Sequence, residues 1–218
     1  MGGFINNAIN NEIASDILNY IFLKVQHCFE LMIQDCLKLC VKIDNNENRI
    51  RDYLFSKYLN NDEIMRKIDF DNFRFFAEVP ENYSNNIPLG RTDLQVISID
   101  DFRHRNRYFI IECKRLDGGA TLNRKYIDDG IRRFVGEDPK YSSYYKTNGM
   151  IGFLVKTIDI DKNVEKINNL LKKDYTDITT KEYLCKETHS GIYISTHGLK
   201  NTDIKLKHVF LDCALIVR

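Results

Sequence analysis

The order of hydrophobic and polar positions divides the chain into a helical first part and a mixed second part. Over residues 4–43 apolar side chains recur at helical spacing and no Pro interrupts them, which predicts one long helix or two shorter ones. A polar break at residues 44–46 separates this segment from a second helix, which is expected over residues 47–59. The pattern also allows a short helical turn around residues 63–68.

Beyond these helices the pattern changes to short apolar runs that are typical of β-strands. Strands are expected over residues 73–79, 93–99, 108–115, 150–155, 192–195 and 208–217, and helices over residues 123–135 and 163–173. The first strand is expected to end at Pro80, and residues 81–90 are expected to form a polar loop. Helices, three consecutive strands, a helix, a strand and a helix, in this order, predict an α/β fold with a mixed central β-sheet flanked by helices.

Charge and composition narrow the class of protein. The 218 residues contain 32 Lys and Arg against 31 Asp and Glu, so the chain lacks the basic excess of proteins that coat nucleic acids nonspecifically. Any contact with phosphates must then come from local basic patches. The six cysteines show no C-x-x-C spacing, and His189 and His197 have no partners at zinc-ligand spacing. No signal peptide is evident and charged residues interrupt the most apolar stretch, residues 17–43, so we expect a cytoplasmic protein without a membrane segment.

One part of the β region is predicted to bring two carboxylates and an ammonium close together. Residues 100–106 form a polar connection between two apolar runs, which predicts a hairpin that places Asp93 opposite Glu112 or its immediate neighbour. Side chains alternate along a strand, so Glu112 and Lys114 are expected on the same face. Charges at the end of a buried hairpin cost several kcal/mol each unless they are paired or bind a metal.

Two interpretations suit these three side chains. Two carboxylates about one hairpin-width apart suit a hard divalent cation that keeps waters and takes phosphate oxygens from a substrate. Lys114 could then orient or deprotonate a water, or neutralise the charge that builds up on the phosphate. The alternative is a buried ion pair between Lys114 and Asp93 or Glu112 that only stabilises the fold.

Two short segments resemble the signature of the PD-(D/E)XK nucleases, the restriction-endonuclease-like superfamily. They are Gly90-Arg91-Thr92-Asp93 and Ile111-Glu112-Cys113-Lys114. Thr92 stands where the name of the superfamily has Pro. The order helix–strand–strand–strand–helix–strand over residues 46–155 is also similar to the core of that superfamily, so the resemblance covers about half of the chain. It implies a restriction-endonuclease-like nuclease domain over residues 45–218, preceded by an N-terminal helical extension over residues 1–44.

The resemblance implies that Asp93 and Glu112 hold Mg²⁺ and that Lys114 serves the attacking water. We expect the backbone carbonyl of Cys113 to join the same coordination sphere, and Mn²⁺ to be able to replace Mg²⁺. The implied activity is that of an endonuclease that hydrolyses DNA phosphodiesters, as in restriction or antiphage defence. The same site could cleave RNA. A domain that binds nucleic acid or a partner protein without cutting is the alternative from another class.

A further acidic residue is expected on the helix before the first strand, as in many members of the superfamily. Glu47 is the candidate because it shares a helix face with Ile50 and Leu54, the apolar face that should turn inward. Its alternative role is in a capping box with Asp44 at the start of the helix. Glu78, at the end of the first expected strand, is a second candidate for the additional carboxylate.

Basic residues near the hairpin and on the helix after it are candidates for phosphate contacts that fix the position of a duplex. They are Arg91, Arg103, Arg105, Arg107, Arg124 and Lys125, with Arg132 and Arg133 further along the same helix. For each of them the alternative is a solvated turn or helix face. Tyr126, on the same helix, could line the site or pack in the core.

The N-terminal segment holds more apolar residues than one amphipathic stripe needs. They are Ile17, Leu18, Ile21, Phe22, Val25, Phe29, Leu31, Met32, Ile33, Leu37, Leu39 and Val41. Such a broad apolar arc predicts contact with a second copy of the chain, in a homodimer, or with a partner protein. The alternative is that two helices fold back on each other and bury the surplus internally.

Overall fold

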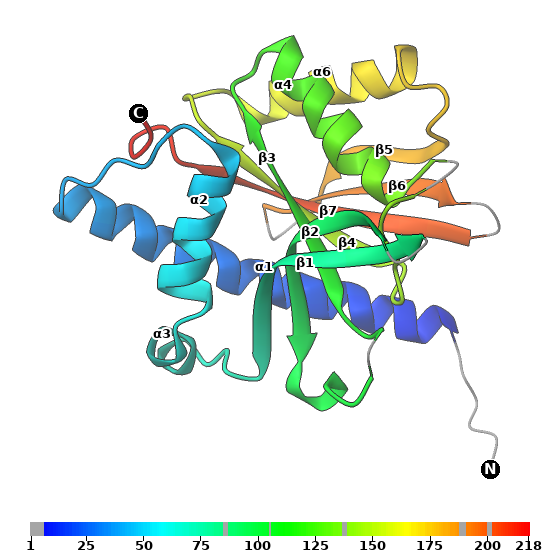
Figure 1. Ribbon diagram of the computed structural model, residues 1–218. Helices are drawn as coiled ribbons and strands as arrows, with labels where there is room; N and C mark the ends of the chain where they lie inside the picture. The colour runs from blue at the N-terminus through cyan, green and yellow to red at the C-terminus, as the bar shows by residue number, and fades with distance from the viewer. Residues whose placement is uncertain (1–6, 85–86, 105, 137–138, 188–190, 200–201) are drawn as a thin grey trace.

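The computed structural model describes residues 7–218 except residues 85–86, 105, 137–138, 188–190 and 200–201, and it has an α/β architecture (Figure 1). The α-helices are α1 (Asn7–Lys38), α2 (Glu47–Leu54), α3 (Asp62–Lys67), α4 (Ala120–Tyr126), α5 (Arg132–Phe134) and α6 (Ile160–Lys173). The strands are β1 (Phe73–Ser84), β2 (Ile87–Ser98), β3 (Phe109–Leu116), β4 (Thr147–Leu154), β5 (Thr180–Lys186), β6 (Tyr193–Leu199) and β7 (Thr202–Asp212). Two π-helical turns, Phe55–Leu59 and Ile127–Ile131, continue α2 and α4, and a 3-10 turn, Ile99–Asp101, follows β2.

The described strands form one seven-stranded mixed sheet in the order β1-β2-β3-β4-β7-β6-β5. β1, β2 and β3 form an antiparallel meander, and β3, β4 and β7 lie parallel to one another. β6 and β5 extend the sheet beyond β7 as antiparallel neighbours. This arrangement confirms the predicted mixed sheet flanked by helices.

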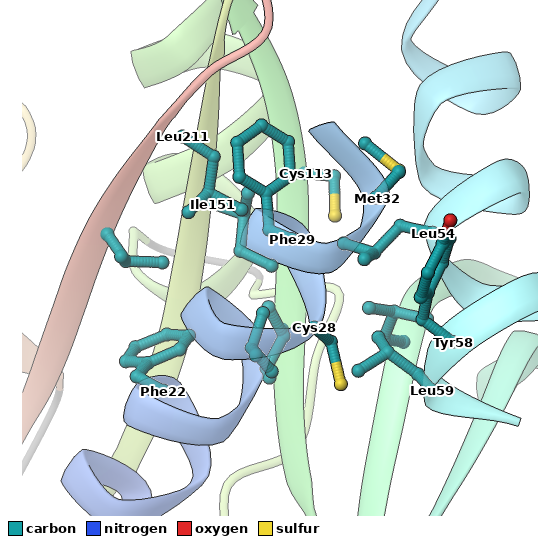
Figure 2. Packing of buried hydrophobic residues seen from close by; sticks show 14 of the residues in the cluster. Phe22, Cys28, Phe29, Met32, Leu54, Tyr58, Leu59, Cys113, Ile151 and Leu211 are labelled. Carbon is teal, nitrogen blue, oxygen red and sulfur yellow. The ribbon is translucent and has the colours of Figure 1, made fainter. Parts of the chain in front are cut away.

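Helices cover both faces of the sheet. α1 and α2 pack on one face, where Phe22 and Phe29 of α1 lie against Ile151 of β4 (Figure 2). α4 and α6 pack on the other face, with α4 in contact with β3. Gly149 of β4 allows α1 to approach closely, since a Cβ atom there would lie 2.6 Å from Phe22 Cζ.

Most of the apolar residues of the N-terminal segment pack against the core of the same chain. Of the apolar residues named above for this segment, all except Leu37 and Leu39 are buried or packed against the core. α1 contacts β4 and β7 and also the π-helical turn that follows α2, so it needs a broader arc than packing on a sheet alone would use. One helix, rather than two that fold back on each other, thus buries most of these apolar side chains. A homodimer and a domain boundary at residue 44 stay predictions.

Strands β1 and β2 are longer than the sequence predicts and form a hairpin with each other. β1 pairs with β2 from Phe73 to Ser84, so the expected strand end at Pro80 and the expected loop over residues 81–90 are wrong. β1 is an edge strand, and edge strands tolerate Pro because a missing N–H there leaves no neighbour unsatisfied. β5 was not predicted, because only Leu184 of this polar edge strand is buried and no apolar run marks it.

The helices follow the predicted order with shifted ends. The helix expected over residues 123–135 extends from Ala120 to Phe134 and contains a π-helical turn in its middle. The short turn expected near residue 63 is α3, and α6 begins three residues before the expected start. Within the part of the chain that the structure describes, none of the helices combines the length and the apolar character that crossing a membrane requires.

Candidate active site

The candidate site lies where β2 and β3 separate. The two strands pair as far as Leu94 and Ile111, and Asp93 and Glu112 are the next residues on each strand. This register confirms the predicted alignment of the hairpin. Beyond it the backbone N–H of Cys113 donates to Asp93 Oδ2 at 2.8 Å. A buried N–H needs an acceptor, and the Asp93 carboxylate supplies the acceptor that a neighbouring strand would otherwise provide.

The Lys114 ammonium lies among four oxygen atoms. Its Nζ atom is 2.7 Å from Glu112 Oε1 and 2.7 Å from the carbonyl oxygen of Cys113. Glu47 Oε1 lies 3.0 Å away and Asp93 Oδ2 lies 3.7 Å away. Three carboxylates, from α2, β2 and β3, therefore converge on one cation.

Glu47 reaches this cluster from the first turn of α2. Asn46, and not Asp44, caps the helix, because its side-chain oxygen accepts hydrogen bonds from two backbone N–H groups of the first turn. The capping-box interpretation of Glu47 with Asp44 is therefore wrong. The Glu47 carboxylate instead pairs with Lys114 through Oε1 and accepts the backbone N–H of Arg115 through Oε2 at 3.0 Å.

Arg51 is a second buried cation at the site, and sequence reasoning missed it. It follows Glu47 by one helical turn on α2, and only 2% of it is exposed. Its Nη1 atom lies 2.5 Å from Asp93 Oδ1, and its Nη2 atom lies 2.5 Å from Glu78 Oε1. Asp93 thus lies between Arg51 and Lys114. The spacing from Glu47 is the signal that could have found Arg51, since residues four apart lie on the same helix face.

Glu78, the second candidate for the additional carboxylate, lies on β1 between Ala77 and Val79, which pair with the two neighbours of Asp93 on β2. Its φ angle of +56° falls in the left-handed region, which is strained for a residue with a side chain. It pairs with Arg51, whereas Glu47 contacts Lys114 directly. Both acidic candidates therefore belong to one cluster but pair with different cations.

Burial and charge shift the pKa values of the site groups. Burial, together with the charge of Asp93, raises the pKa of Glu112 to about 8, although the Lys114 ammonium opposes this shift. Burial lowers the pKa of Lys114, but the three carboxylates around it outweigh burial and raise that pKa above its ordinary value. In this arrangement the Lys114 ammonium donates hydrogen bonds to Glu47, Glu112 and the carbonyl oxygen of Cys113.

Two adjoining cavities open onto the cluster. Their volumes are about 390 and 360 Å³, and the residues that line both are Glu47, Asn48, Lys114 and Arg133. The first is also lined by Glu78, Leu89, Gly90, Arg91, Asp93, Glu112 and Lys140. The second is also lined by Asn46, Arg115, Leu122, Lys125 and Asp129. Carboxylates at the junction and cations along the walls can receive an anionic ester together with a metal cation.

The basic residues of the helix after β3 separate into two groups. Lys125 and Arg133 line the cavities, as does Arg91 on β2. Arg124 and Arg132 instead form ion pairs with aspartates that follow α6. Only the first group can meet a substrate in these cavities.

The basic residues of the β2–β3 turn lie far from the cluster. Arg103 and Arg107 stand at the opposite end of the hairpin from Asp93, separated by roughly 20 Å of extended strand. Arg107 pairs there with Asp101, with 3.4 Å between Nη1 and Oδ1. Arg105 lies outside the described residues. These residues are close to Asp93 in sequence, but the length of the strand carries them away from it.

Tyr126 packs in the core and does not line the cavities. It is fully buried, and its hydroxyl lies 2.8 Å from His208 Nδ1, which agrees with the packing interpretation. His197 is also buried and lies, like His208, within hydrogen-bond distance of the Ser195 hydroxyl. His189 lies outside the described residues.

The carboxylates are held by protein cations in this structure. Among the described residues, no group of three or more His, Cys, Asp or Glu side chains is arranged to hold a metal ion. Arg51 and Lys114 take up oxygen atoms of Asp93 and Glu112 that a metal would need. The donor chemistry nevertheless fits a hard divalent cation, because carboxylate and carbonyl oxygens already surround a position that one cation occupies.

Comparison of the chain with known protein families, curated proteins and solved structures finds no significant match.

Proposed function

We propose that the protein is a Mg²⁺-dependent endonuclease that hydrolyses phosphodiester bonds of DNA. One observation carries the proposal: three carboxylates and a backbone carbonyl meet around the Lys114 ammonium, beside two open cavities. The oxygen atoms belong to Glu47, Asp93, Glu112 and Cys113. Burying several charges together costs folding free energy that an apolar cluster would not cost, and metal-dependent catalysis explains why such a cluster exists.

The order of elements supports a restriction-endonuclease-like core. α2 precedes the antiparallel strands β1, β2 and β3, and α4 connects β3 to the parallel strand β4. This is the helix–strand–strand–strand–helix–strand order that the sequence resemblance implies. The acidic residues and Lys114 lie at the end of the hairpin that the second and third strands form.

Mg²⁺ is the cofactor that this donor set suits, with Mn²⁺ able to replace it. Asp93, Glu112 and the backbone carbonyl of Cys113 would hold the ion. When bound, it would neutralise charge on the phosphate and make a water molecule easier to deprotonate. Lys114 and Arg51 would then give up part of their present contacts with the carboxylates.

Lys114 and Glu47 are the residues best placed to handle the attacking water. The ammonium can donate a hydrogen bond to a water in the cavities, and Glu47 Oε1, 3.0 Å from Lys114 Nζ, can accept a proton from the same water. As the water oxygen attacks phosphorus, the ammonium also stabilises the negative charge that builds up on the phosphate. The raised pKa of Lys114 favours these roles over that of a general base.

The walls of the cavities suit a nucleic-acid backbone. Arg91, Lys125, Arg133 and Lys140 line them. Contacts between such residues and phosphates hold a strand in position without reading its sequence. The resemblance stated above favours DNA, in a cytoplasmic role such as restriction or antiphage defence, while the same site could cleave RNA.

The purified full chain should be incubated with supercoiled plasmid, linear duplex, single-stranded DNA and RNA, each with Mg²⁺, with Mn²⁺ or with a chelator. We expect cleavage of DNA that needs the metal and disappears in Asp93→Asn. Asp101→Asn is the matched control, because Asp101 lies on the same hairpin but at its far end. Cleavage of RNA alone would favour a ribonuclease. Binding of nucleic acid without cleavage under any metal condition would indicate a silent binding domain.

A further inference from the structure

Tyr141 lies in the segment between α5 and β4, outside the motifs that the sequence offers, yet it reaches the centre of the site. Its side chain is almost fully buried, with 2% exposed. The hydroxyl lies 2.6 Å from Glu112 Oε2 and 2.7 Å from the carbonyl oxygen of Arg91. It also accepts a hydrogen bond from Arg133 Nη1 at 2.7 Å. The Tyr141 hydroxyl thus connects β2, β3 and α5.

Gly90 makes room for this tyrosine. A Cβ atom at Gly90 would lie 3.2 Å from Tyr141 Cε1 and 3.3 Å from Lys140 Cβ, which is closer than side chains normally pack. A residue with a side chain at position 90 would crowd Tyr141, which explains why the Gly90-Arg91-Thr92-Asp93 segment begins with glycine. It lets the Tyr141 ring lie against the backbone of β2 and reach Glu112.

The contacts of Glu112 differ between its two oxygen atoms. Oε2 is held by the Tyr141 hydroxyl, whereas Oε1 lies 2.7 Å from Lys114 Nζ and 3.3 Å from Arg133 Nε. A tyrosine hydroxyl has one hydrogen to donate, and a carboxylate is a stronger acceptor than a backbone carbonyl. The hydrogen bond from Tyr141 therefore fixes the rotation of the carboxylate and leaves Oε1 toward Lys114.

We propose that Tyr141, supported by Arg133 and by the space at Gly90, is a positioning residue that directs Glu112 Oε1 toward a divalent cation. The proposal rests on the metal-dependent function proposed above. Hydrogen bonds from residues behind a ligand orient that ligand before the metal arrives. Their loss typically weakens metal affinity or activity by about 10- to 100-fold.

A second tyrosine–carboxylate contact on the same face of the sheet provides a matched control. The Tyr108 hydroxyl lies 2.8 Å from Glu81 Oε1, and Glu81 is 3% exposed. Neither residue lines the two cavities. Tyr108→Phe therefore removes a half-buried tyrosine–carboxylate hydrogen bond without touching Glu112. Ser142, which follows Tyr141 and lies 3.1 Å from the Tyr108 hydroxyl, keeps its own hydrogen bonds from its N–H and its hydroxyl to Glu81. The variant thus separates a loss of stability from a loss of metal affinity.

The experiment measures Mn²⁺ binding to the full chain by electron paramagnetic resonance of the free ion, for wild type, Tyr141→Phe and Tyr108→Phe. We expect Tyr141→Phe to bind Mn²⁺ about 10- to 100-fold more weakly and Tyr108→Phe to bind like wild type. A higher Mn²⁺ concentration should restore cleavage in Tyr141→Phe, which a purely structural defect would not allow. Gly90→Ala, which pushes against the ring, should weaken binding in the same direction.

The outcomes separate this proposal from the proposed function. Wild-type Mn²⁺ affinity in both Tyr141→Phe and Gly90→Ala would overturn the positioning role and leave the nuclease assignment standing. Equal weakening in Tyr141→Phe and Tyr108→Phe would also overturn it, since the effect would then follow stability. A wild-type protein that neither binds Mn²⁺ nor cleaves nucleic acid would overturn both proposals.

Discussion

Nη1 of Arg51 lies 2.5 Å from Oδ1 of Asp93, and this contact joins a buried helix residue to the strand end at which the carboxylates gather. The other oxygen of Asp93 accepts the Cys113 N–H and lies 3.7 Å from Lys114 Nζ. Asp93 thus holds Arg51 and the Cys113 N–H in the fold, and in the proposed function it would also bind the metal ion. Arg51 and Lys114 neutralise carboxylate charge in this structure, so a metal ion that bound here would have to compete with two protein cations.

The first prediction concerns the stability of the Asp93→Ala variant. The substitution leaves Arg51, which is 2% exposed, without one of its carboxylate partners, and leaves the Cys113 N–H without its acceptor. Removing one partner of a buried ion pair typically costs about 3–5 kcal/mol, so we expect a loss in that range in urea unfolding. Asp101→Ala, on the half-buried far end of the hairpin, should cost less. An Asp93→Ala protein as stable as wild type would show that the contact with Arg51 contributes nothing.

The second prediction separates the chemical role of Lys114 from its structural role. Lys114→Met keeps much of the side-chain volume but removes the ammonium, so Mn²⁺ should still bind, with one competing cation fewer. Loss of a donor that acts mainly in the transition state typically slows turnover about 100- to 1,000-fold. Single-turnover cleavage at saturating Mn²⁺ measures this step. Unchanged turnover in Lys114→Met would show that Lys114 only stabilises the fold through its ion pairs.

The third prediction is a pH dependence of metal affinity. Burial and Asp93 raise the pKa of Glu112 to about 8, so below that pH the carboxyl is mostly protonated and must lose its proton to bind a metal. Affinity for Mn²⁺ should rise by about tenfold per pH unit between roughly pH 6 and 8 and level off above this range. Titrations at several pH values measure it, and Glu112→Gln should abolish the dependence. A wild-type affinity that does not change over this range would contradict the proton-coupled binding.

The same shift has an opposite consequence for the metal-free fold. Because the folded-state pKa of Glu112 is raised from its ordinary 4.5 to about 8, the group stabilises the fold fully below the ordinary value. That contribution is lost as the pH rises through about 8. The free energy of unfolding of the metal-free protein should therefore fall as the pH rises from about 4.5 to about 8. It should fall less in Glu112→Gln, which has no carboxyl group to titrate at this position. Urea unfolding at several pH values measures this effect. A wild-type free energy of unfolding that rises with pH over this range, relative to that of Glu112→Gln, would contradict the predicted direction.

The last prediction concerns substrate contacts. Lys125→Gln and Arg91→Gln should weaken binding of nucleic acid of any sequence, because both residues line the cavities beside the carboxylates. Each lost phosphate contact should lower the slope of log affinity against log salt by about 1. Arg107→Gln is the control at the far end of the hairpin. Loss of affinity in Arg107→Gln but not in the other two would place the nucleic acid on the turn instead.

The sequence by itself determined the parts of the site that depend on near neighbours along the chain. The polar connection between β2 and β3 sets the centre of the hairpin, and with it the register that brings Asp93 next to Glu112. The alternation of side chains then puts Lys114 on the same face as Glu112. Helical periodicity likewise turned Glu47 inward, toward Lys114. The alternative role of Glu47 in a capping box with Asp44 was wrong, because Asn46 caps the helix. Turn composition and periods of two or 3.6 residues are local properties that a sequence carries directly.

Only the tertiary structure decided which distant groups complete the site. Arg51 is 42 residues from Asp93, and Tyr141 is 29 residues from Glu112, so no local pattern relates them. Their meeting depends on α2 and the segment before β4 packing against the same end of β3. Arg107 shows the converse, because a residue near Asp93 in sequence lies at the far end of an extended strand. Contacts between separate elements follow from how whole faces pack, and that packing depends on the burial of many side chains together rather than on the preference of any single segment.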